Sequence, residues 1–583
     1  MSARISRHWI ISGIWLLLSV ALIINSWANI RSGVGWDPDD QLRFVQLRDF
    51  LNGQGWFDNR QYRLNPPEGA PMHWSRLIEL PLAAVVRLCA PFFGQGNAEN
   101  IAGTVVPLLL FGGIIFLLSR VSAYVDGQAA GIAAAVIAAM SAPLVMQLRP
   151  MRIDHHGWQI AMAVLALASI FHSNARTSGL VLGAALAVWL HISLEGAPMS
   201  VAFFLFLGWQ WFTRSEAAAR LFWTIVAFAL SSLGLFLSTQ AQGLGAGIYC
   251  DTVSPPHIWA ILMAATIMLP GLNWAPRQAA VRALIMLSAG GAAILVVALR
   301  APECLTGAFG TLDPLVHEYW YIYVMEGMPI WHQQVRAAAV LLAGPVIGLA
   351  SCVFLARKAT GQDRANIVIL AFFTSYALIL SLLVFRTVSV ASAYAVVPAA
   401  VMIAHIFARY RNESVPLRRV GCVAAILLLA VPGSWVSSLI HFLPAKPASQ
   451  AAQAGKNSAA CASASSVAAL GALPKGQFLA PFDMAPMILS HTPHSVLASS
   501  HHRNEPAMHD HIQIFRSPPD AAQLLLKARG INYVAVCANE EELANYAQKD
   551  PDGLWAQMAK GKVPDWFAPL PAMGKSIKVW RVR

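Results

Sequence analysis

Apolar runs recur along the first 441 residues of this 583-residue chain. Each run is about 17–22 residues long, which is the length that an α-helix needs to cross the hydrocarbon core of a bilayer. Hydrophobic residues make up 57% of the chain and charged residues only 12%, so a water-soluble fold would lack the polar surface to cover its core. Because backbone groups inside a bilayer must bond to one another, the sequence predicts a polytopic α-helical membrane protein.

The boundaries of the runs predict about 13 transmembrane helices. A further run at 77–93 is ambiguous, because Glu79, Pro81 and Arg87 interrupt it. The first run has no clear small-residue cleavage site before the acidic stretch that follows, so we expect an uncleaved helix rather than a signal peptide. The predicted spans are 9–30, 99–119, 127–147, 158–174, 178–194, 198–213, 221–241, 257–271, 283–300, 337–356, 366–386, 388–408 and 420–441.

Basic residues decide whether 77–93 crosses the membrane. If it does not cross, the loops on one side hold most arginines and lysines, and the short opposite loops hold little beyond Arg149 and Arg152. Cytoplasmic loops carry this excess, so we expect 77–93 to be an interfacial helix on the outer face of a bacterial inner (cytoplasmic) membrane. The segments expected on the outer, periplasmic side are the first outer loop 31–98, the segment 149–158, the outer loop 301–335 and everything after about 442.

The net charge of +12 reflects these basic loops. No helix-turn-helix, zinc-finger or aromatic RNA-binding pattern accompanies the charge. We therefore expect membrane lipids, and no nucleic acid, among the partners of the chain.

The tail, 442–583, differs in kind from the rest. Its hydrophobicity falls, its turn residues increase, and a helix at 521–530 ends at Gly530, which suits a left-handed C-cap. Alternating strands and helices predict a small periplasmic α/β domain that follows a transmembrane domain at 1–441. The predicted strands are 478–481, 495–500, 532–537 and 577–582.

The cysteines fit this division. Cys250 and Cys304 fall in outer loops, and Cys461 and Cys537 fall in the outer domain. Two disulfides, Cys250–Cys304 and Cys461–Cys537, are therefore possible in an oxidising periplasm. The chain has no CxxC pair, so we do not expect a metal site made of thiolates.

Three aspartates, Asp37, Asp39 and Asp40, follow the first span directly. Clustered carboxylates suit a hard divalent cation, or they could serve as a base that orients an acceptor. The alternative is a solvated loop with an Asp-Pro turn.

A second polar group, Asp154, His155 and His156, follows the third span. Neighbouring residues do not all point the same way, so we do not expect these three alone to form a zinc triad. One carboxylate and one imidazole could join ligands from elsewhere. Alternatively, Asp154 could simply cap the following helix.

Two charged residues lie in apolar or aromatic surroundings on the outer side. Glu326 lies in an aromatic-rich loop that could be an interfacial belt, but a carboxylate in apolar company needs a cation or a metal as partner. Arg386 ends an apolar helix, where it could snorkel to the surface or bind a phosphate with its guanidinium fork.

The tail also holds histidines at irregular spacing. A metal site is possible, but no standard ligand spacing is present, so we expect surface or substrate-contact histidines. They are His491, His494, His501, His502, His509 and His511.

Asp37, Asp154 and Glu326 come from three separate outer loops that the predicted topology places on one face. A divalent cation between them would offset the desolvation of each carboxylate, and Arg386 nearby would suit a lipid-linked phosphate or pyrophosphate. The metal would neutralise the leaving phosphate while a glycosidic bond breaks.

These segments, in this order, resemble the catalytic subunit of oligosaccharyltransferase, a membrane glycosyltransferase of the GT-C type. WDPDDQLRF resembles its first acidic motif, RIDHHGWQI its second, YVMEGMPIW its outer loop with a catalytic Glu, and VFRTVSV the segment with a phosphate-binding Arg. The family's WWDYG motif, which grips the acceptor sequon, corresponds only to APFDMAP, where Asp483 is retained.

The resemblance implies a role for each matching residue. Asp37, Asp40, Asp154 and Glu326 would be catalytic. Mn²⁺ or Mg²⁺ would bind to Asp37, Asp154, Glu326 and His156. Arg386 would hold the phosphate of a polyprenyl-linked sugar donor, and Asp483 would contact the acceptor. The reaction would be an inverting transfer of a sugar or oligosaccharide from polyprenyl (pyro)phosphate.

Other functions stay open. The same fold could move one sugar from a polyprenyl monophosphate to a lipid or envelope polysaccharide rather than to protein. A transporter of lipid-linked sugars would place ionisable residues at mid-membrane on broken helices, a pattern that is not visible here. A structural or sensor protein would not need carboxylates from three loops.

Overall fold

The computed structural model describes residues 7–274, 276–441, 463–537, 540–571 and 577–583. The chain divides into two compact units. We call Met1–Ser26, Thr104–Gly310 and Met325–Leu443 the helical unit. We call Trp27–Gly103, Thr311–Val324 and Pro444–Arg583 the α/β unit.

This division differs from the predicted domains 1–441 and 442–583, because most of the first outer loop belongs with the tail. The physical reason is a shared core. Leu42 and Val45 of helix α3 are buried in one cluster with Phe478 and Ile488 of the tail.

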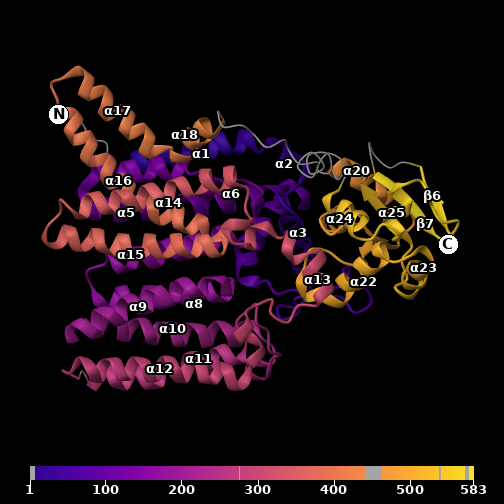
Figure 1. Cartoon of the computed structure of the whole chain (residues 1–583), viewed down its shortest axis with the longest axis horizontal. Helices are drawn as coiled ribbons and strands as arrows, with labels where there is room; N and C mark the ends of the chain where they lie inside the picture. Colours follow the sequence, from indigo (N-terminus) through magenta and orange to yellow (C-terminus); the bar gives the residue numbers. More distant parts are fainter. Residues whose placement is uncertain (1–6, 275, 442–462, 538–539, 572–576) are drawn as a thin grey trace. The chain divides into compact units, whose positions relative to one another are not determined.

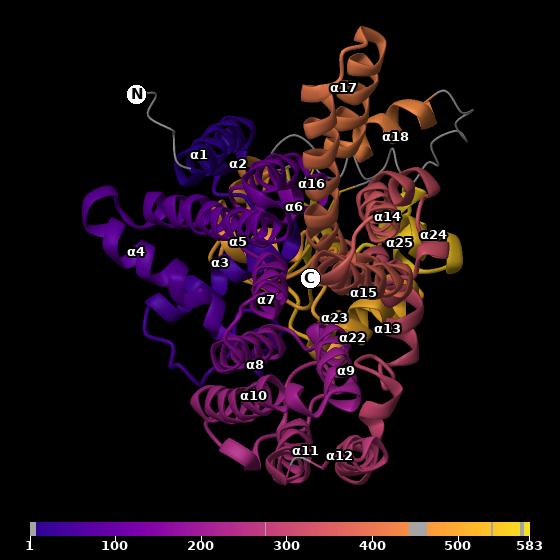
Figure 2. The same ribbon diagram turned by 90° about the vertical axis from the view of Figure 1, so that its left-hand side faces the viewer.

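The helical unit is built from long apolar helices. Figure 1 shows α8 to α12 running side by side, and Figure 2 shows the same helices close to end-on. Its helices are α1 (Arg7–Asn25), α5 (Gln95–Met140, which begins in the α/β unit), α6 (Ala142–Leu148), α7 (His156–Ile170), α8 (Ala175–Ile192), α9 (Ala197–Thr213), α10 (Ala218–Thr239), α11 (Pro255–Trp274), α12 (Ala279–Arg300), α14 (Val335–Ala356), α15 (Gly361–Leu383), α16 (Val388–Asn412), α17 (Pro416–Ala430) and α18 (Pro432–His441).

Among the described residues, nine helices are long and apolar enough to span a membrane, or ten if the bent pair α17 and α18 is one span. The chain is therefore a multi-pass membrane protein, and its predicted count of about 13 spans stays a prediction. The difference has a geometric origin. Two predicted spans are merged in α5, which is kinked at Asp126 and Gly127, and α7 and α9 are only 15 and 17 residues long. The run at 77–93 forms α4 (Glu79–Phe93), which is not one of the nine.

Two glycines let α8 lie directly against α10. A Cβ added at Gly183 would lie 2.2 Å from the carbonyl oxygen of Thr224, and one at Gly179 would lie 2.6 Å from that of Arg220. Small residues at such positions are typical of helices that pack closely within membranes.

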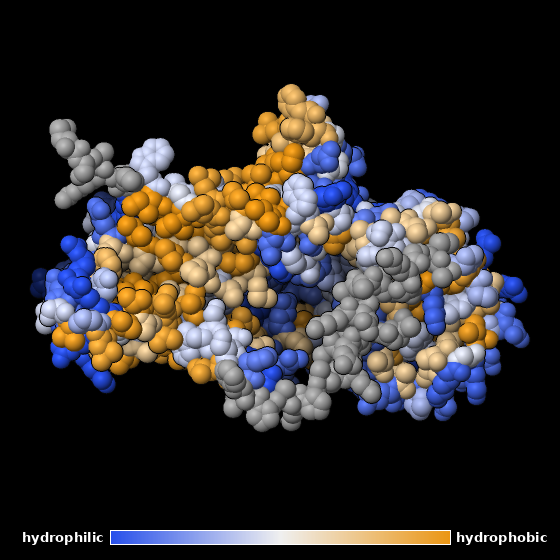
Figure 3. Space-filling view, turned by 90° about the horizontal axis from the view of Figure 1, so that it is seen from above, coloured by the Kyte–Doolittle hydropathy of each residue, from blue (hydrophilic) through white to orange (hydrophobic). Residues whose placement is uncertain are grey.

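The outer surface of the helical unit is apolar. Figure 3 shows hydrophobic side chains gathered over its flank and hydrophilic ones at its end. On α12, Leu287 is 74% exposed and Leu299 is 73% exposed. In water this would be an unusually large apolar patch, whereas a surrounding bilayer solvates it.

The α/β unit contains a mixed five-stranded sheet of order β4-β3-β5-β7-β6. β3 is parallel to β4 and to β5, while β7 is antiparallel to β5 and to β6. Apolar side chains are buried on both faces. The elements are α2 (Trp27–Ser32), α3 (Pro38–Leu51), β1 (Arg60–Gln61), β2 (Ala70–Pro71), α4, α13 (Pro314–Tyr319), α20 (Ala464–Ala468), β3 (Gln477–Leu479), α21 (Ala485–His491), β4 (Ser495–Val496), α22 (Glu505–Arg516), α23 (Pro519–Ala528), β5 (Tyr533–Cys537), α24 (Glu541–Lys549), α25 (Leu554–Ala559), β6 (Phe567–Pro569) and β7 (Ile577–Val582).

The predicted tail strands all occur, and β6 was not predicted. The predicted helix 521–530 is α23, and Gly530 after it has a φ of +63°, as expected for its cap. The predicted disulfide Cys250–Cys304 is formed within the helical unit. Cys461 lies outside the described residues.

Candidate functional site

The group Asp154, His155 and His156 converges in the helical unit, contrary to our expectation that these side chains diverge. Each offers one ligand atom, and the three atoms lie within 4.8 Å of one another. Asp154 bridges the pair, because Oδ1 lies 2.5 Å from Nδ1 of His155 and Oδ2 lies 3.3 Å from Nε2 of His156.

The reason for this convergence is the irregular backbone before α7. Met151 has a φ of +68°, and helical geometry begins only around His155, the N-cap residue of α7. The chain therefore turns at this point, so the spacing of side chains in a regular helix does not apply. All three side chains are buried.

A second group of charges lies at the ends of other helices of the helical unit. Glu195 lies in the 3₁₀ turn η2 (Leu194–Gly196), Arg386 in η9 (Phe385–Thr387) and Glu326 in η7 (Met325–Gly327). Nη1 of Arg386 donates to Oε1 of Glu195 at 2.5 Å and lies 3.8 Å from Oε1 of Glu326. The structure thus brings together the two residues predicted from the sequence, Glu326 and Arg386.

Close approach at this site depends on a glycine. A Cβ added at Gly327 would lie 2.8 Å from Nη2 of Arg386. The amide N–H of Phe385 also donates to the carbonyl of Met328 at 3.2 Å, which ties the two turns together.

Gln159 joins the two charged groups. Its Nε2 donates to Oε2 of Glu195 at 3.1 Å and lies 3.4 Å from Nδ1 of His156. The indole N–H of Trp189 donates to Oε1 of Gln159 at 3.1 Å, which fixes the orientation of the amide. A continuous polar network therefore runs from Asp154 through His156, Gln159 and Glu195 to Arg386.

The electrostatics of the network favour an anionic Glu195. Burial alone would raise the pKa of this carboxyl, but the charge of Arg386 and the hydrogen bond from Gln159 lower the pKa to about 2. Glu195 therefore holds the Arg386 guanidinium as a charged partner throughout the physiological pH range.

The network opens into a cavity of about 120 Å³. His156, Glu195 and Arg386 are part of its charged and polar wall, and its apolar wall includes side chains of α8, α9, α15 and α16. A larger, mostly apolar cavity of about 430 Å³ lies in the same unit between α5, α6, α14, α16 and the bent pair α17 and α18. The unit thus offers both a charged pocket and space for an apolar chain.

Asp37 and Asp40 lie in the α/β unit, where they form a capping box at the start of α3. The amide of Asp40 donates to Asp37 at 3.0 Å, and the amide of Trp36 donates to Asp40 at 2.9 Å. The Asp-Pro turn of the alternative is present at the start of α3, but the loop is not solvated at Asp40, whose side chain is buried. A capping carboxylate can still accept a ligand with its remaining lone pairs.

Asp483, the predicted acceptor contact, follows β3 and is exposed. The amide beside it, that of Phe482, donates to Oε2 of Glu542 at 2.7 Å. Burial is the main cause that raises the pKa of Glu540 well above its ordinary value, and the negative charges of Glu542 and Asp483 raise this pKa further. Asp483 therefore belongs to an acidic patch of the α/β unit.

Several tail histidines are not at the surface, contrary to the prediction. His494, His501 and His511 are buried. The reason is specific bonding, since His494 bonds to the carbonyl of Leu470 at 2.9 Å and His511 lies 2.9 Å from Glu542.

The residues around Asp154 fit a divalent cation by their chemistry. One carboxylate and two imidazoles converge from adjacent positions, and nitrogen and oxygen donors of this kind suit Mn²⁺ or Zn²⁺. Mg²⁺ prefers oxygen ligands, so it fits this set less well.

Sequence reasoning missed Gln159 and Trp189. One signal was available, because Gln159 lies three residues after His156, and residues at this spacing share one face of a helix. Nothing in the sequence connects Trp189 to the site.

The helices give the chain a fold similar to that of GT-C membrane glycosyltransferases of known structure. The archaeal oligosaccharyltransferase AglB of Archaeoglobus fulgidus, in complex with an inhibitory peptide and a dolichol-phosphate, matches with a TM-score of 0.68 at 13% identity. The match covers 97% of this chain and 72% of that one.

Two further solved structures resemble the chain. The A. fulgidus enzyme tethered to an acceptor peptide with an NVT sequon gives a TM-score of 0.64 at 13% identity, over 97% of this chain and 73% of that one. ArnT of Cupriavidus metallidurans bound to undecaprenyl phosphate gives a TM-score of 0.45 at 12% identity, and the match covers 97% of this chain and 98% of that one. No protein-family model matches the chain, and no curated protein matches its sequence. The similarity at this identity is one of fold.

Proposed function

We propose that the chain is a glycosyltransferase that moves a sugar or oligosaccharide from a polyprenyl (pyro)phosphate to an acceptor at the periplasmic face of a bacterial inner membrane. The observation that carries the proposal is the pairing of Arg386 with Glu195 in the wall of a cavity that also contains His156. The fold is similar to that of an oligosaccharyltransferase solved in complex with a dolichol-phosphate, which supports the choice of a lipid-linked donor.

Arg386 would bind the donor phosphate. Its guanidinium has five N–H donors in a plane, and this fork matches the oxygens of a phosphate. Glu195 holds the guanidinium on the cavity wall. Because Glu195 is anionic, it fixes the side chain in place and lowers the cost of ordering it when the donor binds.

Asp154 and His156 would hold a divalent cation, Mn²⁺ or Mg²⁺, with Asp37 and Glu326 as further predicted ligands. The cation, when bound, supplies positive charge that neutralises the leaving phosphate. The donor set around Asp154 favours Mn²⁺ of the two.

The other predicted roles complete the proposal. Asp40 would act on the acceptor as a base or by orienting it, and Asp483 would contact the acceptor in the α/β unit. Transfer would invert the configuration at the sugar carbon, since one displacement with no covalent intermediate suffices. The apolar cavity beside α16 would hold the first isoprene units of the carrier.

The acceptor could also be a lipid or an envelope polysaccharide, with a polyprenyl monophosphate as the donor. The observation in favour is the tail motif APFDMAP, which lacks the tryptophans and the glycine of the sequon-binding WWDYG motif.

A comparison of glycans tests the proposal. Cells that carry wild-type protein are compared with cells that carry Asp154→Asn, with the exposed Asp363→Asn as a matched control. Mass spectrometry is applied separately to the protein, lipid and polysaccharide fractions. We expect one fraction to lose a sugar in Asp154→Asn cells only, and that fraction identifies the acceptor. Equal glycans in all three strains would refute the proposal.

A further inference from the structure

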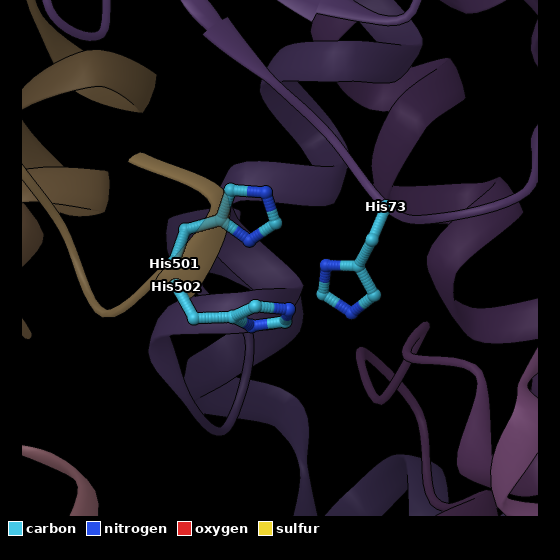
Figure 4. Close-up of side chains that lie close together, drawn as sticks. All are labelled: His73, His501 and His502. Carbon is cyan, nitrogen blue, oxygen red and sulfur yellow. The ribbon is translucent and has the colours of Figure 1, made fainter. Parts of the chain in front are cut away.

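A second group of histidines lies entirely within the α/β unit. His73 follows β2, whereas His501 and His502 precede α22 in the tail. Figure 4 shows the His73 ring approaching the two tail rings from a separate segment of the chain. Each of the three histidines offers one ring nitrogen, and these nitrogens lie within 4.8 Å of one another.

We propose that His73, His501 and His502 form a binding site for a Zn²⁺-type cation. Three imidazoles with a fourth position open to water or substrate are a common arrangement for zinc. Three nitrogen ligands do not suit the hard cations Mg²⁺ and Ca²⁺, because these ions prefer oxygen ligands. The site therefore differs in chemistry from the cation site proposed around Asp154.

The tautomer of His501 supports metal binding. Its Nε2 lies 3.2 Å from the carbonyl oxygen of Pro71, and since a carbonyl can only accept, Nε2 must carry the proton. The lone pair of a neutral ring is then on Nδ1. Metal-binding histidines are typically oriented in this way, with the second ring nitrogen donating to a backbone carbonyl.

The ring of His501 is buried against an indole. His501 is only 2% exposed and packs against the indole of Trp74, with ring centroids 5.4 Å apart. The guanidinium of Arg43 lies 4.3 Å from the same indole centroid. The packing against Trp74 therefore holds the His501 ring in a fixed position.

The rings are held close to the required spacing. Zn–N bonds of ~2.0–2.1 Å in tetrahedral geometry place ligand nitrogens ~3.3 Å apart. The three nitrogens lie within 4.8 Å of one another, so a closure of at most about 1.5 Å completes the site. The ring centroid of His73 lies 4.8 Å from that of His501 and 4.7 Å from that of His502. His73 and His502 are half-buried, so rotations of these two rings can supply this closure.

The backbone that carries the three rings is firmly connected. The amide of Asn65 donates to the carbonyl of Val496, and the amide of Val496 donates to the carbonyl of Arg63, both at 2.9 Å. The guanidinium of Arg63 donates to the carbonyls of Leu489 and Thr492 at 2.7 and 3.0 Å. A bound metal would therefore meet a preorganised site that cross-links the first outer loop to the tail.

Metal binding by the purified full-length protein tests the proposal. The Asp154→Asn/His156→Ala background removes the other candidate site, so any remaining Zn²⁺ reports on the histidine group. After stripping with EDTA, the protein is loaded with Zn²⁺ for elemental analysis, and with Co²⁺ for visible absorption. We expect one Zn²⁺ per chain and the intense visible bands of tetrahedral Co²⁺.

In the same background, His73→Ala/His502→Ala should weaken Zn²⁺ affinity on the order of 100-fold or more and abolish the Co²⁺ bands. His509→Ala, another half-buried histidine of the α/β unit, is the matched control and should leave both unchanged. If the double variant does not fold, the single variant His502→Gln replaces it in the same measurements. Absence of Zn²⁺ from the background protein, or equal binding by all variants, would overturn the proposal. The readout is metal content, so its outcome is independent of whether the chain transfers sugars.

Discussion

Arg386 and Glu195, from turns at the ends of two different helices, form a 2.5 Å charge-assisted hydrogen bond in the helical unit. Gln159 donates to the other carboxylate oxygen of Glu195 at 3.1 Å. The pair is separated by 191 residues in the sequence. Its position in the cavity wall makes the Glu195 carboxylate a positioning residue for the phosphate-binding arginine that we propose.

Glu195→Gln removes the negative charge but keeps the shape of the side chain. We expect the KM for a lipid-linked donor to rise more than kcat falls, because Arg386 loses its anchor while the reacting groups stay in place. Steady-state assays of both parameters check this prediction. A fall in kcat with an unchanged KM would contradict the positioning role.

The pH dependence of stability gives a second check. The pKa of Glu195 is lowered from 4.5 to about 2, so the ionised form is favoured in the folded state. Its contribution is fully present above pH 4.5 and is lost as the pH falls toward 2. Because the side chain is partly exposed, we expect only about 1–2 kcal/mol. Thermal unfolding in detergent should show wild-type protein more stable than Glu195→Gln at pH 7, with the difference shrinking below pH 4.5. A constant difference would contradict it.

Gly327→Ala should disturb the site without unfolding the chain. The added methyl group would lie 2.8 Å from Nη2 of Arg386, so the guanidinium must move. We expect transfer activity to fall several-fold with little change in thermal stability. Gly245→Ala is the control, since a Cβ there meets nothing within 4 Å. Equal activity of the two variants would show that Arg386 tolerates displacement.

Gly183→Ala tests the packing of α8 against α10. The new Cβ would lie 2.2 Å from a backbone oxygen, which cannot rotate away, so the helices must separate. Overpacking of this kind costs about 1–3 kcal/mol. Gly234→Ala on α10 meets nothing within 4 Å and should be neutral or slightly stabilising. Melting temperatures of the purified variants measure the contrast, and similar values for both would contradict the close helix contact.

The sequence predicted the regular parts of the molecule well, because they follow local rules. Apolar length identified the membrane helices, and Gly530 marked the end of α23 through its left-handed backbone. The predicted number of spans exceeds the number of long apolar helices where helix length alone does not identify a span, as in the kinked α5 and the short α7.

The sequence singled out Glu326 and Arg386 because charges in apolar surroundings need partners, and the two side chains do lie close together. Their catalytic and phosphate-binding roles stay predictions. The convergence of Asp154, His155 and His156 was not predicted, because it depends on an irregular turn at Met151. His73 was not connected with His501 and His502, since only the fold brings these distant segments together.

The most direct test of the central claim is the cellular level of polyprenyl-linked sugars. Extracts of cells with wild-type protein, Arg386→Ala and the exposed control Arg300→Ala are compared by mass spectrometry. We predict that the lipid-linked donor accumulates only in Arg386→Ala cells, because transfer is blocked after the donor has been made. Unchanged donor levels in Arg386→Ala cells, with acceptor glycans also intact, would contradict the claim that this chain consumes a lipid-linked sugar.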